Sequence, residues 1–145
     1  MPLPLACSPT LSKSPAAVTC YRWAARLVNE GVRVCLSEII DYEIRRESIL
    51  KNSMRGLDLL DRLPLLVEYV PIRTPVMRRA AELWAEARRR GLPTADSAAL
   101  DADVILAAQA QLLGEATGDE VVVATENVRH LARFVNARRW QEIRP

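Results

Sequence analysis

The spacing of apolar residues alternates along the chain between the helical period and short β-branched runs, and this alternation predicts the secondary structure. Helices are expected at residues 15–30, 38–51, 56–63, 74–90, 98–113 and 127–135. Strands are expected at residues 32–36, 65–70 and 120–124. Helices and strands in this order favour an α/β fold in which helices flank a parallel sheet.

Two segments depart from simple alternation. Residues 120–124, Glu120-Val-Val-Val-Ala124, form a compact β-branched run without alternation of polar and apolar positions, so this strand is expected to be buried on both sides. Residues 1–14 contain Pro2, Pro4 and Pro9 and show no periodic spacing. We therefore expect an irregular lead-in at residues 1–14, followed by a single domain at residues 15–145.

Composition narrows the class of protein. A chain of 145 residues that is 50% hydrophobic and 26% charged is long enough for one globular domain with a real core. No apolar run reaches the roughly 18–20 residues that span a bilayer, and the first residues lack a signal-peptide pattern. We expect a cytoplasmic protein that does not contact membranes.

Among the residue types that bind metals, acidic residues are common in this sequence, whereas cysteine and histidine are rare. The three cysteines show no C-x-x-C spacing and are interpreted as reduced thiols, and His130 is the only histidine. Any bound metal would therefore be held by oxygen ligands, which suits Mg²⁺ or Mn²⁺. Every basic residue except Lys13 and Lys51 is arginine. This bias fits either phosphate contacts or solvated helix faces in a genome of biased composition.

Three acidic residues stand beside apolar residues on two of the predicted helices. Glu43 falls on the apolar side of the helix at residues 38–51. Asp101 and Asp103 stand in the first turn of an otherwise apolar helix. For Glu43, an edge-of-core position and a functional cleft remain open. For the two aspartates, helix capping and metal chemistry remain open.

Polar residues follow the buried strand at residues 120–124. Thr125 and Asn127 can offer oxygen to a metal or a phosphate beyond the end of that strand, or they can cap the next helix. In a parallel fold these residues and the acids can converge. Clustered carboxylates repel one another unless a cation joins them, and acids without histidine are typical of Mg²⁺-dependent phosphodiester hydrolysis.

Three sequence blocks together resemble the PIN-domain nucleases. They are Tyr42-Glu-Ile-Arg-Arg46, Asp101-Ala-Asp-Val-Ile-Leu-Ala-Ala-Gln-Ala110 and Val121-Val-Val-Ala-Thr-Glu-Asn-Val-Arg-His-Leu131. The resemblance implies a three-layer α/β/α sandwich with a central parallel sheet. It also implies a metal-dependent ribonuclease, a type that includes toxins of type II toxin–antitoxin pairs. The expected partners are RNA, an antitoxin protein and a second copy of the chain.

The resemblance assigns roles residue by residue. Glu43 matches the second acid of the family and Asp103 the third, so both are expected to bind Mg²⁺ or Mn²⁺. Asp101 either assists catalysis or caps the helix. Thr125 and Asn127 match the element that positions water or phosphate, and Asn127 is neutral where many members carry a fourth aspartate.

The N-terminus departs from the family. PIN domains open with a hydrophobic strand that ends in an aspartate, the first metal ligand, whereas no aspartate precedes Asp41 here. We expect that the strand and its acid are missing, through truncation or a misplaced start. This predicts impaired nuclease activity and keeps open an inactive PIN-like module that binds RNA or a partner protein. An unrelated α/β binding protein is a further alternative.

Overall fold

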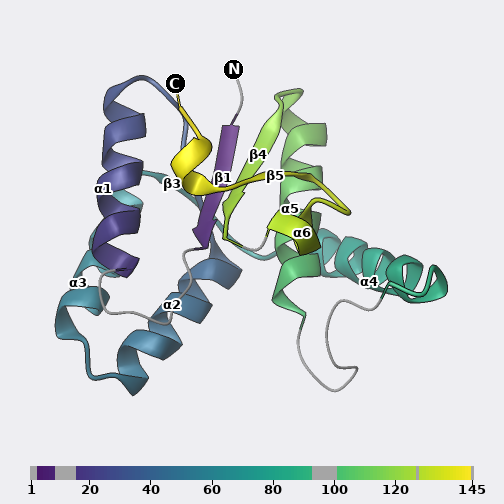
Figure 1. Cartoon of the computed structure of the whole chain (residues 1–145), viewed down its shortest axis with the longest axis horizontal. Helices are drawn as coiled ribbons and strands as arrows, with labels where there is room; N and C mark the ends of the chain where they lie inside the picture. The colour runs from purple at the N-terminus through teal and green to yellow at the C-terminus, as the bar shows by residue number, and fades with distance from the viewer. Residues whose placement is uncertain (1–2, 9–15, 93–100, 127, 145) are drawn as a thin grey trace.

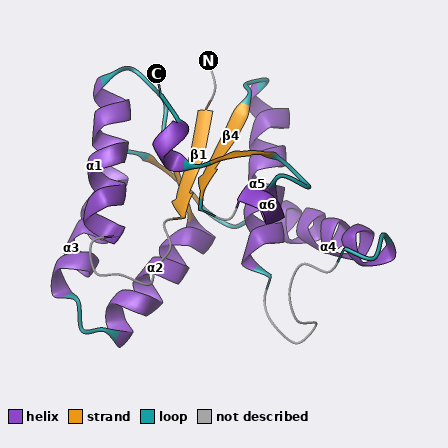
Figure 2. Ribbon diagram, in the orientation of Figure 1, coloured by secondary structure: helices purple, strands orange, loops and turns teal. Residues whose placement is uncertain are grey.

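The structure, a computed structural model, describes residues 3–8, 16–92, 101–126 and 128–144, and the side chains from Thr19 onward within these ranges except that of residue 20. Figure 1 shows a central group of strands between two groups of helices. Helices α1 (Ala16–Asn29) and α3 (Met54–Arg62) lie on one side, and α4 (Thr74–Arg89) and α5 (Ala102–Thr117) lie on the other (Figure 2).

Five parallel strands form one sheet in the order β3-β2-β1-β4-β5. They are β1 (Leu3–Ser8), β2 (Cys35–Ser37), β3 (Glu68–Val70), β4 (Val121–Thr125) and β5 (Asn136–Arg138). Parallel neighbours require crossover connections, and here the helices provide them. The expected α/β architecture with a central parallel sheet is confirmed.

The first strand is present, contrary to the expected irregular lead-in. β1 occupies the centre of the sheet, where its Cα atoms pair with those of β4 from Leu3 opposite Val121 to Ser8 opposite Thr125, with an irregularity between Leu5 and Cys7. The expected absence of this strand is therefore not confirmed. The prolines misled the prediction because proline removes a backbone donor, yet two neighbouring strands still supply most of the ladder.

The predicted helices and strands recur with shifted ends. Helix α2 (Glu38–Leu50) and α4 match within one residue, whereas the segment predicted as strand from residue 65 begins as a 3-10 turn, η1 (Leu63–Leu65). Helix α6 (Val128–Leu131) is one short turn. Strand β5 and the 3-10 turn η2 (Trp140–Glu142) follow it in a segment where we expected only a short tail.

The core lies between α5, the sheet and the helices opposite. Val123 and Leu106 are fully buried, as is Leu27 of α1. The prediction that the strand at residues 120–124 is buried on both faces is confirmed, since Val122, Val123 and Ala124 are all buried. Within the described part of the chain, no helix is long and apolar enough to cross a membrane.

Candidate active site

Helix α2 carries Glu43 beyond the end of strand β2. The helix begins directly after Ser37, the last residue of β2, so its first turns lie at the carboxyl edge of the sheet. Ile40 and Ile44 on this helix are buried in the core, and Glu43 beside them is half-buried. The apolar flank of α2 thus places one carboxylate at the boundary between core and solvent.

Helix α5 carries the two predicted aspartates at its start. Asp101 is buried and occupies the N-cap position, where its Oδ1 accepts a hydrogen bond from the backbone N–H of Val104 at 3.2 Å. Asp103 lies in the first turn and is half-buried. The capping interpretation is confirmed for Asp101, and this cap fixes the turn from which Asp103 extends.

The electrostatics of Glu43 show that the acids of α2 and α5 interact. Burial raises the pKa of the Glu43 carboxyl above its ordinary value, the positive charge of Arg46 opposes that shift, and the negative charge of Asp103 adds to it. Two carboxylates that disfavour each other's charge form an arrangement in which a cation is stabilising.

A buried hydrogen-bond network joins the same two helices. Ser37, at the N-cap position of α2, makes no capping bond and instead donates its hydroxyl hydrogen to Oε1 of Gln109 in α5. The Nε2 of Gln109 donates to the backbone oxygens of Val70 at 3.0 Å and Pro71 at 3.3 Å. Sequence reasoning missed this role, although a single glutamine within the apolar run of α5 was a signal.

The ends of β1 and β4 complete this edge of the sheet. Thr125 is the last residue of β4, is buried, and lies opposite Ser8, the last residue of β1. No residue of β1 is acidic. Asn127, the other predicted positioning residue, lies outside the described residues.

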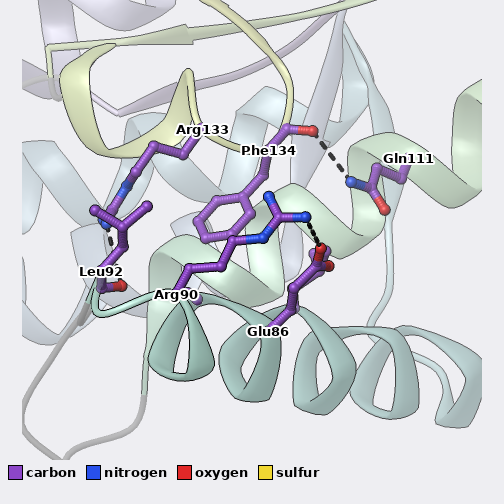
Figure 3. Close-up of a pocket in the computed structure, with 8 residues that line it drawn as sticks. Glu86, Arg90, Leu92, Gln111, Arg133 and Phe134 are labelled. Carbon is purple, nitrogen blue, oxygen red and sulfur yellow. Dashed lines mark hydrogen bonds and ion pairs between the residues drawn. The ribbon is translucent and has the colours of Figure 1, made fainter.

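A separate pocket lies between the end of α4 and the segment before β5. It has a volume of about 140 Å³ and is drawn in Figure 3. Its polar groups are engaged with one another: Arg90 pairs with Glu86 at 2.5 Å, and the Nη1 of Arg133 donates to the carbonyl oxygen of Leu92 at 3.2 Å. Neither Glu43 nor Asp103 lines this pocket, so it is distinct from the acid pair.

Comparison with solved structures identifies the fold. DNA-bound VapBC from Salmonella typhimurium aligns with a TM-score of 0.67 and 20% identity over 97% of this chain and 99% of the other. The chain has the PIN-like fold. VapBC-1 from nontypeable Haemophilus influenzae shares this PIN-like fold, with a TM-score of 0.61 and 16% identity over 83% of this chain and 87% of the other. No protein-family model matches the sequence, and no curated protein is similar to it.

The PIN-like fold brings the predicted site elements to one edge of the sheet. In parallel α/β sheets, ligands bind beyond the carboxyl ends of the strands. Ser8 and Thr125 end neighbouring strands there, and α2 begins there with Glu43 in its second turn. Because α5 is followed by β4 in the opposite direction, the first turn of α5 lies at this edge too (Figure 1).

The residues of this edge fit a hard divalent cation with few protein ligands. Among the described residues there is no group of three or more histidine, cysteine, aspartate or glutamate side chains that could hold a metal. Mg²⁺, however, commonly binds proteins through one or two carboxylates and completes its shell with water and substrate phosphates. Glu43 and Asp103 supply that number of carboxylates.

Proposed function

We propose that this protein is a metal-dependent ribonuclease of PIN type whose centre consists of Glu43 and Asp103. The observation that supports the proposal most strongly is the placement of these two half-buried carboxylates in the early turns of α2 and α5, at the carboxyl edge of the sheet. Their charges oppose one another, so binding of Mg²⁺ or Mn²⁺ between them would remove an unfavourable interaction.

Each residue has a definite part in the proposed reaction. A bound Mg²⁺ would lower the pKa of a water molecule and stabilise charge on the phosphate of RNA. Glu43 and Asp103 would hold the metal, and Asp101 fixes the turn that presents Asp103. Thr125, at the end of β4, would position water or phosphate, a role that the resemblance gives to Asn127 as well.

The first experiment is cleavage of a mixed-sequence single-stranded RNA by the purified protein with Mn²⁺ and with EDTA. We expect metal-dependent cleavage that falls by at least about 100-fold in Glu43→Gln and in Asp103→Asn, because each change removes several kcal/mol of transition-state stabilisation.

Glu47→Gln is the matched control for this experiment. Glu47 lies one turn further along the same helix and forms an ion pair with Lys51 at 3.3 Å. It should cleave like the parent protein. Cleavage that persists in EDTA, or that is equal in Glu43→Gln and Glu47→Gln, would refute the proposal.

An antitoxin protein is the proposed partner, and the protein would then act as the toxin of a pair in the cytoplasm. The fold neighbours are VapBC toxin–antitoxin assemblies. Large apolar side chains are also exposed on and beside α2 and α3, and exposed apolar groups often mark protein interfaces. They are Tyr42, Ile49, Leu50, Met54 and Leu65. Self-association as a homodimer is part of the same proposal, and sedimentation of the purified protein tests it.

A second candidate function is favoured by the end of β1. The PIN resemblance implies that the first strand ends in the first metal ligand, and no residue of β1 is acidic. Loss of one carboxylate weakens cation binding, so a module that binds RNA or a partner without cleaving it is the alternative. If the folded protein binds RNA but does not cleave it with any divalent metal, the non-cleaving module is supported over the nuclease. An aspartate introduced at the end of β1, as Cys7→Asp or as Ser8→Asp, should then restore cleavage.

A further inference from the structure

A groove between α1 and the C-terminal turn η2 is lined almost entirely by hydrogen-bond donors. Its lining residues are Thr19, Arg22, Trp23, Arg26 and Trp140, and its volume is about 310 Å³. The four residues of α1 follow one another at positions i, i+3, i+4 and i+7, so they share one face of the helix. None of the five is acidic.

No carboxylate in the described part of the chain forms an ion pair with the arginines of this groove. Arg22 and Arg26 are exposed, and neither forms an ion pair with any described residue. Other arginines of the chain are paired, for example Arg33 with Glu68 at 2.8 Å and Arg79 with Glu115 at 2.9 Å. Two adjacent guanidinium groups without a carboxylate repel each other and favour an incoming anion.

The floor of the groove contains a buried donor. Trp23 is 4% exposed, and its Nε1–H has no acceptor among the described residues. An indole N–H can only donate, and a buried donor without an acceptor is unfavourable. The Nε1–H of Trp140, by contrast, donates to Oε1 of Glu126 at 2.5 Å, which fixes this ring as the wall of the groove.

We propose that this groove binds a phosphate group of a single-stranded RNA, with a neighbouring base against Trp140. Guanidinium groups bind phosphate oxygens in bidentate fashion, and half-exposed aromatic rings stack on bases of any sequence. Arg138, Arg139 and Arg144 in the same C-terminal segment are also exposed, as is Glu142. The inference rests on the proposed function for its choice of RNA, and it concerns a positioning site outside the acid pair.

The test measures binding separately from cleavage. In a Glu43→Gln background with EDTA, anisotropy of a fluorescein-labelled single-stranded RNA gives affinity without turnover. We expect the double variant Arg22→Gln/Arg26→Gln to bind at least about 10-fold more weakly, and the slope of log affinity against log salt to fall by about 0.7–1.4. Arg55→Gln/Arg78→Gln removes the same charge from exposed positions on α3 and α4 and should leave affinity within about twofold.

Tryptophan fluorescence tests whether RNA binds in the groove itself. In a Trp84→Phe background the remaining tryptophans are Trp23 and Trp140, so RNA should change the tryptophan emission, and the two groove arginines should be required for that change. Inorganic phosphate and a polyglutamate peptide are titrated in parallel. An emission change with phosphate but not RNA assigns the groove to a free phosphate and overturns the RNA inference, and preference for the peptide overturns it in favour of an acidic partner.

The outcomes separate this inference from the proposed nuclease. RNA binding that depends on Arg22 and Arg26, in a protein that never cleaves, supports the groove and refutes the nuclease. Cleavage that depends on Glu43, together with equal RNA affinity in the two double variants, supports the nuclease and refutes the groove.

Discussion

Ser37 and Gln109 are 72 residues apart in the sequence and share a buried hydrogen bond between the Oγ of Ser37 and the Oε1 of Gln109. Ser37 immediately precedes α2, which carries Glu43, and Gln109 lies on α5, which carries Asp103. The bond therefore sets the position of one acid-bearing helix relative to the other. Gln109 also donates to Val70 and Pro71, so the end of β3 is held in the same network.

The first prediction concerns this network. Gln109→Leu should lower the free energy of unfolding by about 2–4 kcal/mol, because it leaves the Ser37 hydroxyl and the Val70 carbonyl buried without their partner. Chemical denaturation of the variant measures the loss. Gln141→Leu is the control: it removes one exposed hydrogen bond to Glu126 and should cost less than about 0.5 kcal/mol. Equal costs for the two variants would contradict the importance of the network.

Substitutions at Asp101 and at Asp103 should affect different properties of the protein. Asp101→Ala removes the acceptor for the Val104 N–H and should cost about 1 kcal/mol, whereas Asp101→Asn keeps a capping oxygen and should cost only a few tenths. Asp103→Asn leaves the Asp101 cap in place and should abolish metal-dependent cleavage. The comparison requires melting curves and cleavage rates for all three variants. If Asp101→Asn also abolished cleavage, Asp101 would be a metal ligand as well as a cap.

The raised pKa of Glu43 predicts a pH dependence of stability in metal-free protein. Because the folded state holds the Glu43 proton more tightly than the unfolded state, the free energy of unfolding falls as pH rises from the ordinary glutamate pKa of about 4.5 through the raised pKa of the folded state. Glu43→Gln stays neutral at every pH. Its melting temperature in EDTA should therefore exceed that of the parent at pH 7, and the difference should disappear at acidic pH.

Added Mg²⁺ provides the converse measurement. The cation should raise the melting temperature of the parent at pH 7 and leave that of Glu43→Gln unchanged, since ligand binding to the folded state stabilises it. Glu47→Gln should respond to Mg²⁺ like the parent. A parent protein that melts at the same temperature with and without Mg²⁺ would argue against a metal at this position.

Local patterns were sufficient for the regular elements and for part of the candidate site. The proline at the start of α4 and the apolar spacing within α2 and α4 are local signals, and both helices match the prediction within one residue. The acid on the apolar flank of α2 was also visible, and the structure places Glu43 where it interacts with Asp103. The burial of β4 followed from its unbroken apolar run.

The misses arise where long-range pairing outweighs local preference. β1 contains Pro4, which disfavours a central strand locally, but the strand still pairs with a parallel neighbour on each side. β5 is a polar three-residue edge strand that is formed by pairing with β4, so it leaves no periodic signal. The roles of Gln109 and of the α1 groove depend on partners that are distant in sequence.

Alanine substitutions of two glycines near the end of α5 should change the free energy of unfolding in opposite directions. Apolar spacing suggested that the helix stops at Gly114, but it continues to Thr117 and is capped by Gly118, whose φ is 74°. A Cβ at Gly118 meets nothing within 4 Å, so the cost of Gly118→Ala is conformational and should be about 1–2 kcal/mol, the penalty of the left-handed region. Gly114→Ala lies within the helix, where its Cβ would be 3.4 Å from the backbone oxygen of Asp119, and it should be neutral or stabilise by up to about 1 kcal/mol. Denaturation of the two variants side by side measures both values, and a helix that ended at Gly114 would give the reverse order.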